Sequence, residues 1–191
     1  ETGTEVKGRA VAPVRPPFQR RKPGYEPAEA REHPRILFRK QDLPALREKA
    51  ATPFGQAALA AMNDAVGAGL KYQLLGDRKY ADQAAEMVRK LLPEIHDGGH
   101  GRGWGSCLYQ VGAAYDLCYD AWPEDFKRRL GDYMVWATER LFYRPAMVTG
   151  TANWHACSNY AGPIYVGPAF AGLALWGEKG PPPAKPVEPN A

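Results

Sequence analysis

The sequence predicts an all-α protein built from antiparallel helical hairpins. Two observations favour this fold class. Apolar residues recur at helical spacing through most of residues 34–178, and short connections with glycine or helix-capping residues separate these stretches. Strand-like alternation of apolar and polar residues is not evident. With 191 residues, of which 45% are hydrophobic, the chain is long enough to bury a core.

The expected helices follow one another along the chain. After a short extended entry from His33 to Phe38, Asp42 is expected to cap a helix that ends at Ala50. Further helices are predicted over about 54–75, from a cap at Asp77 to about 92, and over about 104–121, 123–143 and 152–176. A glycine-rich loop is expected over 96–103, and a bend or break in the last helix near Pro163 and Pro168.

The distribution of polar residues favours two layers of helices. The last predicted helix is apolar almost all round, as expected of a buried inner helix. The helix predicted over about 123–143 instead has an outer face with Lys127, Arg128, Asp132 and Glu139. This difference favours a two-layered helical ring, an (α/α) toroid of antiparallel hairpins, over a simple bundle.

The ends of the chain differ in composition from its middle. Residues 1–33 are rich in proline and arginine and predict an extended arm, whereas 34–178 form the helical domain and 179–191 a Pro-rich linker or cut loop. Ten Lys or Arg side chains against three Glu lie between Lys7 and Lys40, so the net charge of +4 originates in the arm. We expect a solvated arm and no nucleic-acid partner; contact with a polyanion or another subunit is the alternative.

Neither a membrane span nor a disulfide scaffold is predicted. No apolar run approaches the roughly 20 residues that cross a bilayer, and the N-terminus lacks the apolar stretch of a signal peptide, so we expect a mature, soluble chain without a membrane partner. Cys107 and Cys118 are separated by about 16 Å along one predicted helix and cannot bond to each other. We expect buried thiols, and a bridge from Cys157 to one of them stays open.

The segment 149–160 is the most informative for function. His155 and Asn159 are four residues apart and share a face at the start of a helix, and Asn153 lies at its cap. Backbone N–H groups and the positive end of the helix dipole point the same way. The segment predicts a site for a negatively charged group. The alternative is structural: Asn153 as a cap, His155 in the core, and Asn159 bonded to a loop.

The glycine-rich loop supplies further candidates for the same cleft. His100, Arg102 and Trp104 are expected to bind substrate, because aromatic rings stack on sugars and guanidinium groups pair with carboxylates or sulfates. The alternative is a surface loop beside a core tryptophan. His96 and His100 have a spacing found in metal sites, but glycines separate them and no third ligand is evident, so we predict no metal.

Several motifs taken in order resemble a known family. They are His33-Pro34-Arg35-Ile36-Leu37-Phe38, Asp42-Leu43-Pro44-Ala45-Leu46-Arg47, Trp104, Ala114-Tyr115-Asp116, and Asn153-Trp154-His155 with Asn159. Together they resemble the N-terminal helical domain of the heparinase II/III-like polysaccharide lyases and the related alginate lyases and uronyl epimerases. The resemblance covers roughly residues 33–178.

The resemblance implies a fold and a reaction. It implies an incomplete (α/α) toroid followed by C-terminal β-sandwich domains, in a secreted or periplasmic enzyme that cleaves uronic-acid polymers by β-elimination without a cofactor. His155 would neutralise the substrate carboxylate or act as base, and Asn153 and Asn159 would orient it. Trp154 and Tyr160 would contact the acidic polysaccharide.

The family's catalytic tyrosine and a further histidine would fall beyond Ala191. The remainder of the same precursor, as a second chain, is therefore an expected partner.

Two other functions remain open. One is a noncatalytic carbohydrate-binding or interaction module built on helical hairpins. The other is a helical-toroid glycoside hydrolase, in which Asp116 and Asp120 would be the paired carboxylates on one helical face. We expect Asp116 to belong instead to a structural hydrogen-bond network.

Overall fold

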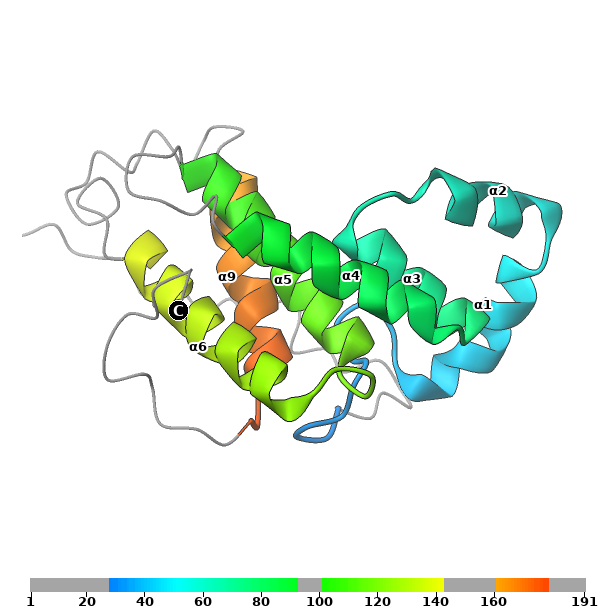
Figure 1. Cartoon of the computed structure of the whole chain (residues 1–191), viewed down its shortest axis with the longest axis horizontal. Helices are drawn as coiled ribbons and strands as arrows, with labels where there is room; N and C mark the ends of the chain where they lie inside the picture. The colour runs from blue at the N-terminus through cyan, green and yellow to red at the C-terminus, as the bar shows by residue number, and fades with distance from the viewer. Residues whose placement is uncertain (1–27, 93–100, 143–160, 179–191) are drawn as a thin grey trace, which may run out of the picture.

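The computed structural model describes residues 28–92, 101–142 and 161–178, and within these ranges the chain is helical with no strand. Seven α-helices lie in the described part, with a 3-10 turn, Lys40–Asp42, before the first (Figure 1). They are α1 (Leu43–Ala50), α2 (Pro53–Ala61), α3 (Ala65–Leu75), α4 (Arg78–Leu91), α5 (Gly101–Cys118), α6 (Glu124–Phe142) and α9 (Ala161–Leu175). The predicted all-α class is confirmed.

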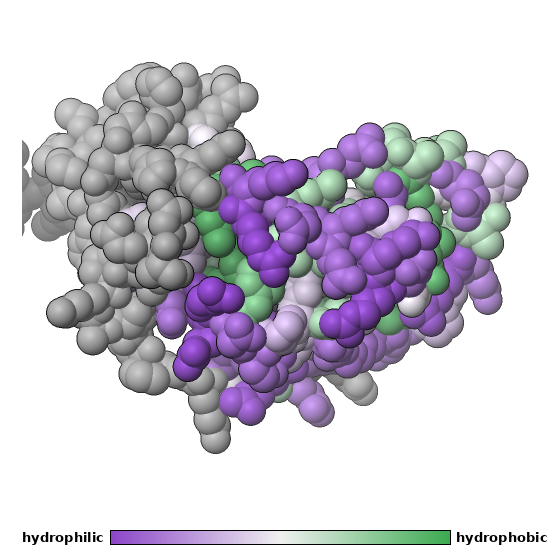
Figure 2. Space-filling model, viewed as in Figure 1, coloured by the Kyte–Doolittle hydropathy of each residue, from purple (hydrophilic) through white to green (hydrophobic). Residues whose placement is uncertain are grey.

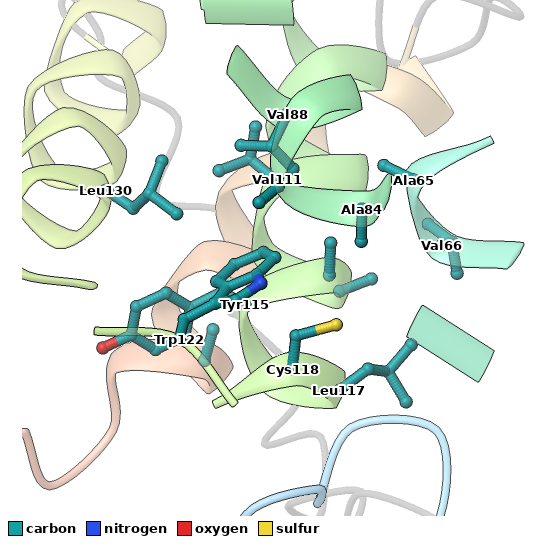
Figure 3. Close-up of a cluster of buried hydrophobic side chains, with 14 of the residues drawn as sticks. Ala65, Val66, Ala84, Val88, Val111, Tyr115, Leu117, Cys118, Trp122 and Leu130 are labelled. Atoms are coloured by element: carbon teal, nitrogen blue, oxygen red, sulfur yellow. The ribbon is translucent and has the colours of Figure 1, made fainter. Parts of the chain in front are cut away.

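Helix α5 lies at the centre of the described domain. Its neighbours are α3 and α4, α6, and α9, with which it makes its most extensive contact. Side chains on several sides of α5 are fully buried, among them Leu108, Val111 and Leu117. Figure 3 shows α5 side chains together with Ala65 and Val66 of α3, Ala84 and Val88 of α4, and Leu130 of α6. The hydrophobic core is therefore organised around this one helix.

Glycines allow α5 and α9 to pack backbone against backbone. A Cβ atom built on Gly167 would lie 2.4 Å from the carbonyl oxygen of Gly105, and one built on Gly112 would lie 3.0 Å from the backbone nitrogen of Ala171. Residues near the N-terminus of α5 thus contact residues near the N-terminus of α9, and residues further along α5 contact residues further along α9. The two helices run parallel, and their first turns lie at the same end of the domain, near the last turn of α6 (Figure 1).

The predicted boundary between α3 and α4 is confirmed. Gly76 adopts the left-handed conformation, with φ of 74°, that ends α3, and the Asp77 side chain accepts the Lys79 N–H at the start of α4. The single helix predicted over 54–75 is wrong, because the chain leaves helical geometry between Met62 and Asp64. There the Asp64 carboxylate accepts the Gly67 N–H at 2.7 Å and caps a new helix.

The start of α5 also differs from the prediction. The helix begins at Gly101, so the last three residues of the predicted glycine-rich loop belong to its first turn. Helix α9 is continuous through Pro168, and Pro163 lies in its first turn, where a missing N–H costs nothing. The break expected at these prolines is therefore absent from the described residues of α9.

The predicted assignment of inner and outer faces needs two corrections. Helix α9 is not buried all round: the side chains of Tyr165 and Leu173, and that of Trp176 directly after the helix, are about half exposed. Lys127, predicted on the outer face of α6, is buried instead. Its alkyl stem and ammonium group cover the Tyr119 ring, with Nζ 3.8 Å from the ring centroid.

Helices α1 and α2 form a projection at the opposite end of the domain from the first turns of α5 and α9 (Figure 1). Helix α2 leaves Phe54 84% exposed, and Figure 2 shows hydrophobic atoms in this region of a largely hydrophilic face. Among the helices that the structure describes, none combines the length and apolar character needed to cross a bilayer.

The close packing of α5 on α9 predicts opposite effects for two glycine substitutions in α9. Gly167→Ala would drive a methyl group into the Gly105 backbone and should lower the free energy of unfolding by about 2 kcal/mol. Gly172→Ala meets no atom within 4 Å and should raise the free energy of unfolding by about 0.5–1 kcal/mol through helix propensity. Urea unfolding of both variants measures the difference; equal stabilities would contradict this packing.

Candidate functional site

The residues predicted to form the site lie mostly outside the described part of the chain. Those outside it are Asn153, Trp154, His155, Asn159, Tyr160 and His100. Arg102 and Trp104 lie in the first turn of α5, and their side chains are not among those described. The proposed catalytic and substrate-binding roles of these residues stay predictions.

The described helices nevertheless show where both candidate segments join the domain. Helix α9 begins at Ala161, one residue after Tyr160, and α5 begins at Gly101, one residue after His100. The contact of Gly105 with Gly167 holds the first turns of these helices side by side. Two segments separated by about 50 residues in the sequence therefore join the same end of one helix pair, at the positive ends of two parallel helix dipoles.

The most complete polar cluster in the described residues lies at the other end of the same helices. We call it the His33 cluster: His33, Asp116, Tyr119 and Glu178. The His33 ring is 2% exposed, with Nδ1 2.8 Å from Oδ1 of Asp116 and Nε2 3.1 Å from Oε1 of Glu178. The entry segment, residues 28–39, is thereby joined to α5 and to the residue that follows Gly177 at the end of α9.

Asp116 is the carboxylate at the centre of this cluster. It is 1% exposed, and besides His33 it accepts the backbone N–H groups of Arg35, at 3.0 and 3.2 Å, and Ile36, at 2.9 Å. A buried carboxylate requires such donors, because an unpaired charge in the interior is strongly unfavourable. Asp116 therefore fixes the non-helical backbone of the entry segment against α5, as the sequence predicted in assigning it to a structural network.

Aromatic rings enclose the His33 imidazole. Tyr119 stacks on it with ring centroids 3.9 Å apart, and Tyr115 meets it edge to face at 6.0 Å. The Tyr119 hydroxyl donates to Oε2 of Glu178 at 3.0 Å, and burial together with this carboxylate raises the pKa of Tyr119 to about 12. The phenol therefore keeps its proton, and remains a donor, at any pH near neutrality.

Two arginines of the entry segment hold the C-terminal end of α9. Arg35 donates to the carbonyls of Leu173 and Ala174, at 2.9 and 2.7 Å, and Arg31 donates to the carbonyl of Gly177 at 3.1 Å. The last carbonyls of a helix lack partners within it and form the negative end of its dipole, so guanidinium groups stabilise them. The Arg35 guanidinium also lies 5.6 Å from the Trp176 ring centroid.

The geometry of the His33 cluster suits a structural junction rather than catalysis. Its histidine and central carboxylate are closed to solvent, and their ring nitrogens and oxygens are engaged within the protein. Asp116 also lies roughly 18 Å along α5 from Trp104, so the cluster is distant from the predicted substrate end. The described residues contain no group of three His, Cys, Asp or Glu side chains placed to hold a metal ion.

The sequence did not identify His33 and Glu178 as partners. They are separated by 145 residues, and no local pattern pairs them. One signal was available: Glu178 is the first charged residue after α9, a helix that contains no charged residue.

Asp120 differs from Asp116 despite sharing its predicted helical face. It lies in the turn after α5, is about half exposed, and pairs with Lys40 at 3.1 Å. Because Asp116 is enclosed and Asp120 is solvated, the two do not form a pair open to a common substrate. The glycoside hydrolase alternative gains no support from them.

The two described cysteines behave as the sequence predicted. Cys107 and Cys118 are both buried in α5. Burial raises the pKa of the Cys118 thiol well above its usual range, which keeps it protonated and unreactive. Cys157 lies outside the described residues.

The two aspartates provide a matched pair of variants for the structural role of Asp116. Asp116→Asn keeps the shape of the side chain but removes its charge and replaces one of two accepting oxygens with an NH2 group that faces buried donors. It should lower the free energy of unfolding by about 3 kcal/mol. Asp120→Asn removes a solvated ion pair and should change it by less than about 1 kcal/mol. Urea unfolding near neutral pH compares the two variants. Similar losses of unfolding free energy would contradict the structural role of Asp116.

Comparisons with known proteins add no assignment: no family model matches this chain, and none of the curated proteins or solved structures compared with it matches either.

Proposed function

We propose that this chain is the helical part of a polysaccharide lyase that cleaves a uronic-acid polymer by β-elimination. One observation carries the proposal: the backbone contact between Gly105 and Gly167 brings the first turns of α5 and α9 together. The segments that hold the candidate residues each adjoin one of these turns. An acidic sugar bound at that end would meet residues from both segments.

The arrangement of the helices supports a toroid as the architecture. In a two-layered helical ring, successive inner helices run parallel to one another and an outer helix connects each to the next. Helices α5 and α9 are parallel neighbours, and α6 returns antiparallel between them in the sequence. We propose that α5 and α9 are inner helices of an incomplete ring, which C-terminal β-sandwich domains would follow in a secreted or periplasmic enzyme.

The chemistry of β-elimination sets what the site must provide. The proton on C5 of a uronate is too weakly acidic to be removed while the adjacent carboxylate keeps its full charge. In the proposed mechanism His155 neutralises that carboxylate, and Asn153 and Asn159 orient it by hydrogen bonds. A base then takes the C5 proton, the C4–O bond breaks as the C4=C5 double bond forms, and the leaving oxygen receives a proton.

The positive ends of α5 and α9 favour an anion in the same place. Unpaired N–H groups at a helix N-terminus stabilise negative charge, and two parallel helices present theirs together. Tyrosine is the base implied by the family resemblance, supplied by a later helix of the same precursor. The proposed partner is thus the remainder of that precursor as well as the acidic polysaccharide.

A noncatalytic interaction module is the second candidate, and one observation favours it. Helix α9 exposes three large apolar side chains, Tyr165, Val166 and Leu173, and the turn after it exposes Trp176. Such a surface suits contact with another protein or domain. The same apolar surface would also suit a lyase in which helices from later in the precursor cover it. A measurement of activity must therefore distinguish the lyase from the interaction module.

The deciding measurement is ultraviolet absorbance during incubation with a panel of uronic-acid polymers, with the precursor remainder added in a parallel series. A lyase should produce the absorbance of the new double bond, and His155→Ala should slow its appearance by about 10²–10⁴-fold. Asp120→Asn, a solvated change in the turn after α5 at the opposite end of that helix from Trp104, should leave the rate unchanged.

Other outcomes would replace the proposal by its alternatives. Polymer binding without absorbance in either series indicates an interaction module. New reducing ends without absorbance indicate a hydrolase.

A further inference from the structure

One side of helix α9 is exposed from Tyr165 to the turn that follows the helix. The exposed residues on this side are spaced four, three and four apart, so they lie in one line along the helix. We call this line the α9 stripe: Tyr165, Ala169, Gly172 and Trp176. It is opposite to Gly167 and Ala171, which lie against α5.

The α9 stripe has an aromatic ring at each end and small residues between them. Tyr165 is 47% exposed and Trp176 is 50% exposed, and the eleven residues that separate them correspond to about 17 Å of helix. A Cβ atom built on Gly172 would meet no atom within 4 Å, so the middle of the stripe is open. No charged residue occurs from 161 to 177. Aromatic, uncharged surfaces of this kind bind proline-rich segments in the polyproline II conformation.

A segment with the matching composition follows α9 directly. We call residues 179–191 the proline segment; it contains five prolines, Pro181, Pro182, Pro183, Pro186 and Pro189. Proline fixes φ near the value of polyproline II and cannot continue a helix or a central strand. The sequence of 181–189 therefore favours a polyproline II helix.

Such a helix would have one polar edge and two apolar edges. Polyproline II has three residues per turn, so residues three apart share an edge. Lys185 and Glu188 share one edge, with Pro182. The other two edges are apolar throughout: Pro181, Ala184 and Val187 on one, and Pro183, Pro186 and Pro189 on the other. From Pro183 to Pro189 the length is about 19 Å, close to the about 17 Å between the two rings of the stripe.

The end of α9 turns the chain out of the helix beside the stripe. Gly177 adopts the left-handed conformation with φ of 77°, and the Glu178 N–H donates to the Leu175 carbonyl at 2.9 Å. Two residues, Lys179 and Gly180, separate this turn from the first proline and can span about 7 Å. The prolines can therefore reach the Trp176 end of the stripe.

Charge favours the proline segment over the proline-rich arm as the occupant. Arg31 and Arg35 lie at the Trp176 end of the stripe, where Arg31 donates to the Gly177 carbonyl and the Arg35 guanidinium lies 5.6 Å from the Trp176 ring centroid. Residues 1–27 contain six Lys or Arg and three Glu, a net charge of +3, whereas 179–191 contain two Lys and one Glu, a net charge of +1. The arm would bring more positive charge to these arginines.

We propose that residues 181–189 dock along the α9 stripe as a polyproline II helix, with the two apolar edges on the stripe and Lys185 and Glu188 facing solvent. Carbonyls of this helix have no internal partners, so they accept hydrogen bonds from the Trp176 indole and the Tyr165 hydroxyl. The docking does not depend on the proposed lyase activity. A docked proline segment covers the surface that would otherwise suit another protein.

NMR relaxation of the full chain tests the docking through the amides of the proline segment. Ala184, Lys185, Val187 and Glu188 each carry an N–H between prolines. Docking predicts backbone order parameters of about 0.8 for these amides, as in the helices, and nuclear Overhauser contacts from proline ring protons to the rings of Tyr165 and Trp176. An undocked segment would give order parameters below about 0.6.

Two matched pairs of variants locate the contact. Trp176→Ser should lower the four order parameters below about 0.6, whereas Phe54→Ser, an equally polar change at an exposed ring on α2, should leave them at about 0.8. Ala184→Glu places a charge on an apolar edge and should release the segment. Lys185→Glu, on the polar edge, should not.

Three results would overturn the proposal. The first is order parameters below about 0.6 in the unmodified chain. The second is a rigid proline segment that neither Trp176→Ser nor Ala184→Glu releases, which would place its contact elsewhere. The third is a dimer in sedimentation that Trp176→Ser dissociates, which would make a second copy the occupant. Ala184→Glu changes no described residue, so it remains decisive if Trp176→Ser does not fold.

Discussion

The close approach of α5 and α9 determines the arrangement of the other described helices. Their backbones meet at Gly105 and Gly167 and again at Gly112, where side chains would hold ordinary helices further apart. This contact leaves α5 surrounded, because α3 and α4 cover one side and α6 another. It also sets the direction of α9, and with it the end of the domain at which the segments before α5 and α9 join.

The two ends of this helix pair are built differently. At the C-terminal end, Asp116, His33 and two arginines join the helices to the entry segment through hydrogen bonds that need specific partners. The core between the ends combines small and aliphatic side chains, with alanines where α5 meets its neighbours, and a few aromatic rings such as those of Phe126 and Tyr133. Specific polar contacts therefore fix the relative positions of the elements, and apolar packing supplies most of the driving force.

Local features of the sequence predicted the local features of the fold. Gly76 and Asp77 predicted a helix boundary because a left-handed glycine and a capping carboxylate act over a few residues. Asn63-Asp64 carried a similar signal, but the apolar residues on both sides concealed it, and one helix was predicted where two exist. Burial of Lys127 and exposure of one α9 face depend on which helices are neighbours, and periodicity along one helix does not contain that information.

The same contrast between local and long-range information applies to the candidate site. The residue types and spacing of 149–160 predict an anion site. The structure adds that α9, which begins directly after this segment, runs parallel to α5, so that both helices begin at one end of the domain. The contact between His33 and Glu178 could not be predicted from the sequence, because contacts across 145 residues follow from the tertiary fold. Asp116 was predicted correctly because a lone carboxylate among buried apolar residues of a helix must find donors.

The separation of these ends has an evolutionary consequence. Roughly 18 Å of helix lies between Asp116 and Trp104, and mutations more than about 7–10 Å apart with no shared partners usually have additive effects. Substitutions in the segments that precede α5 and α9 can therefore accumulate without loosening the junction at the other end. A lineage that inherits this scaffold can vary one end of the domain while keeping the same folding determinants at the other.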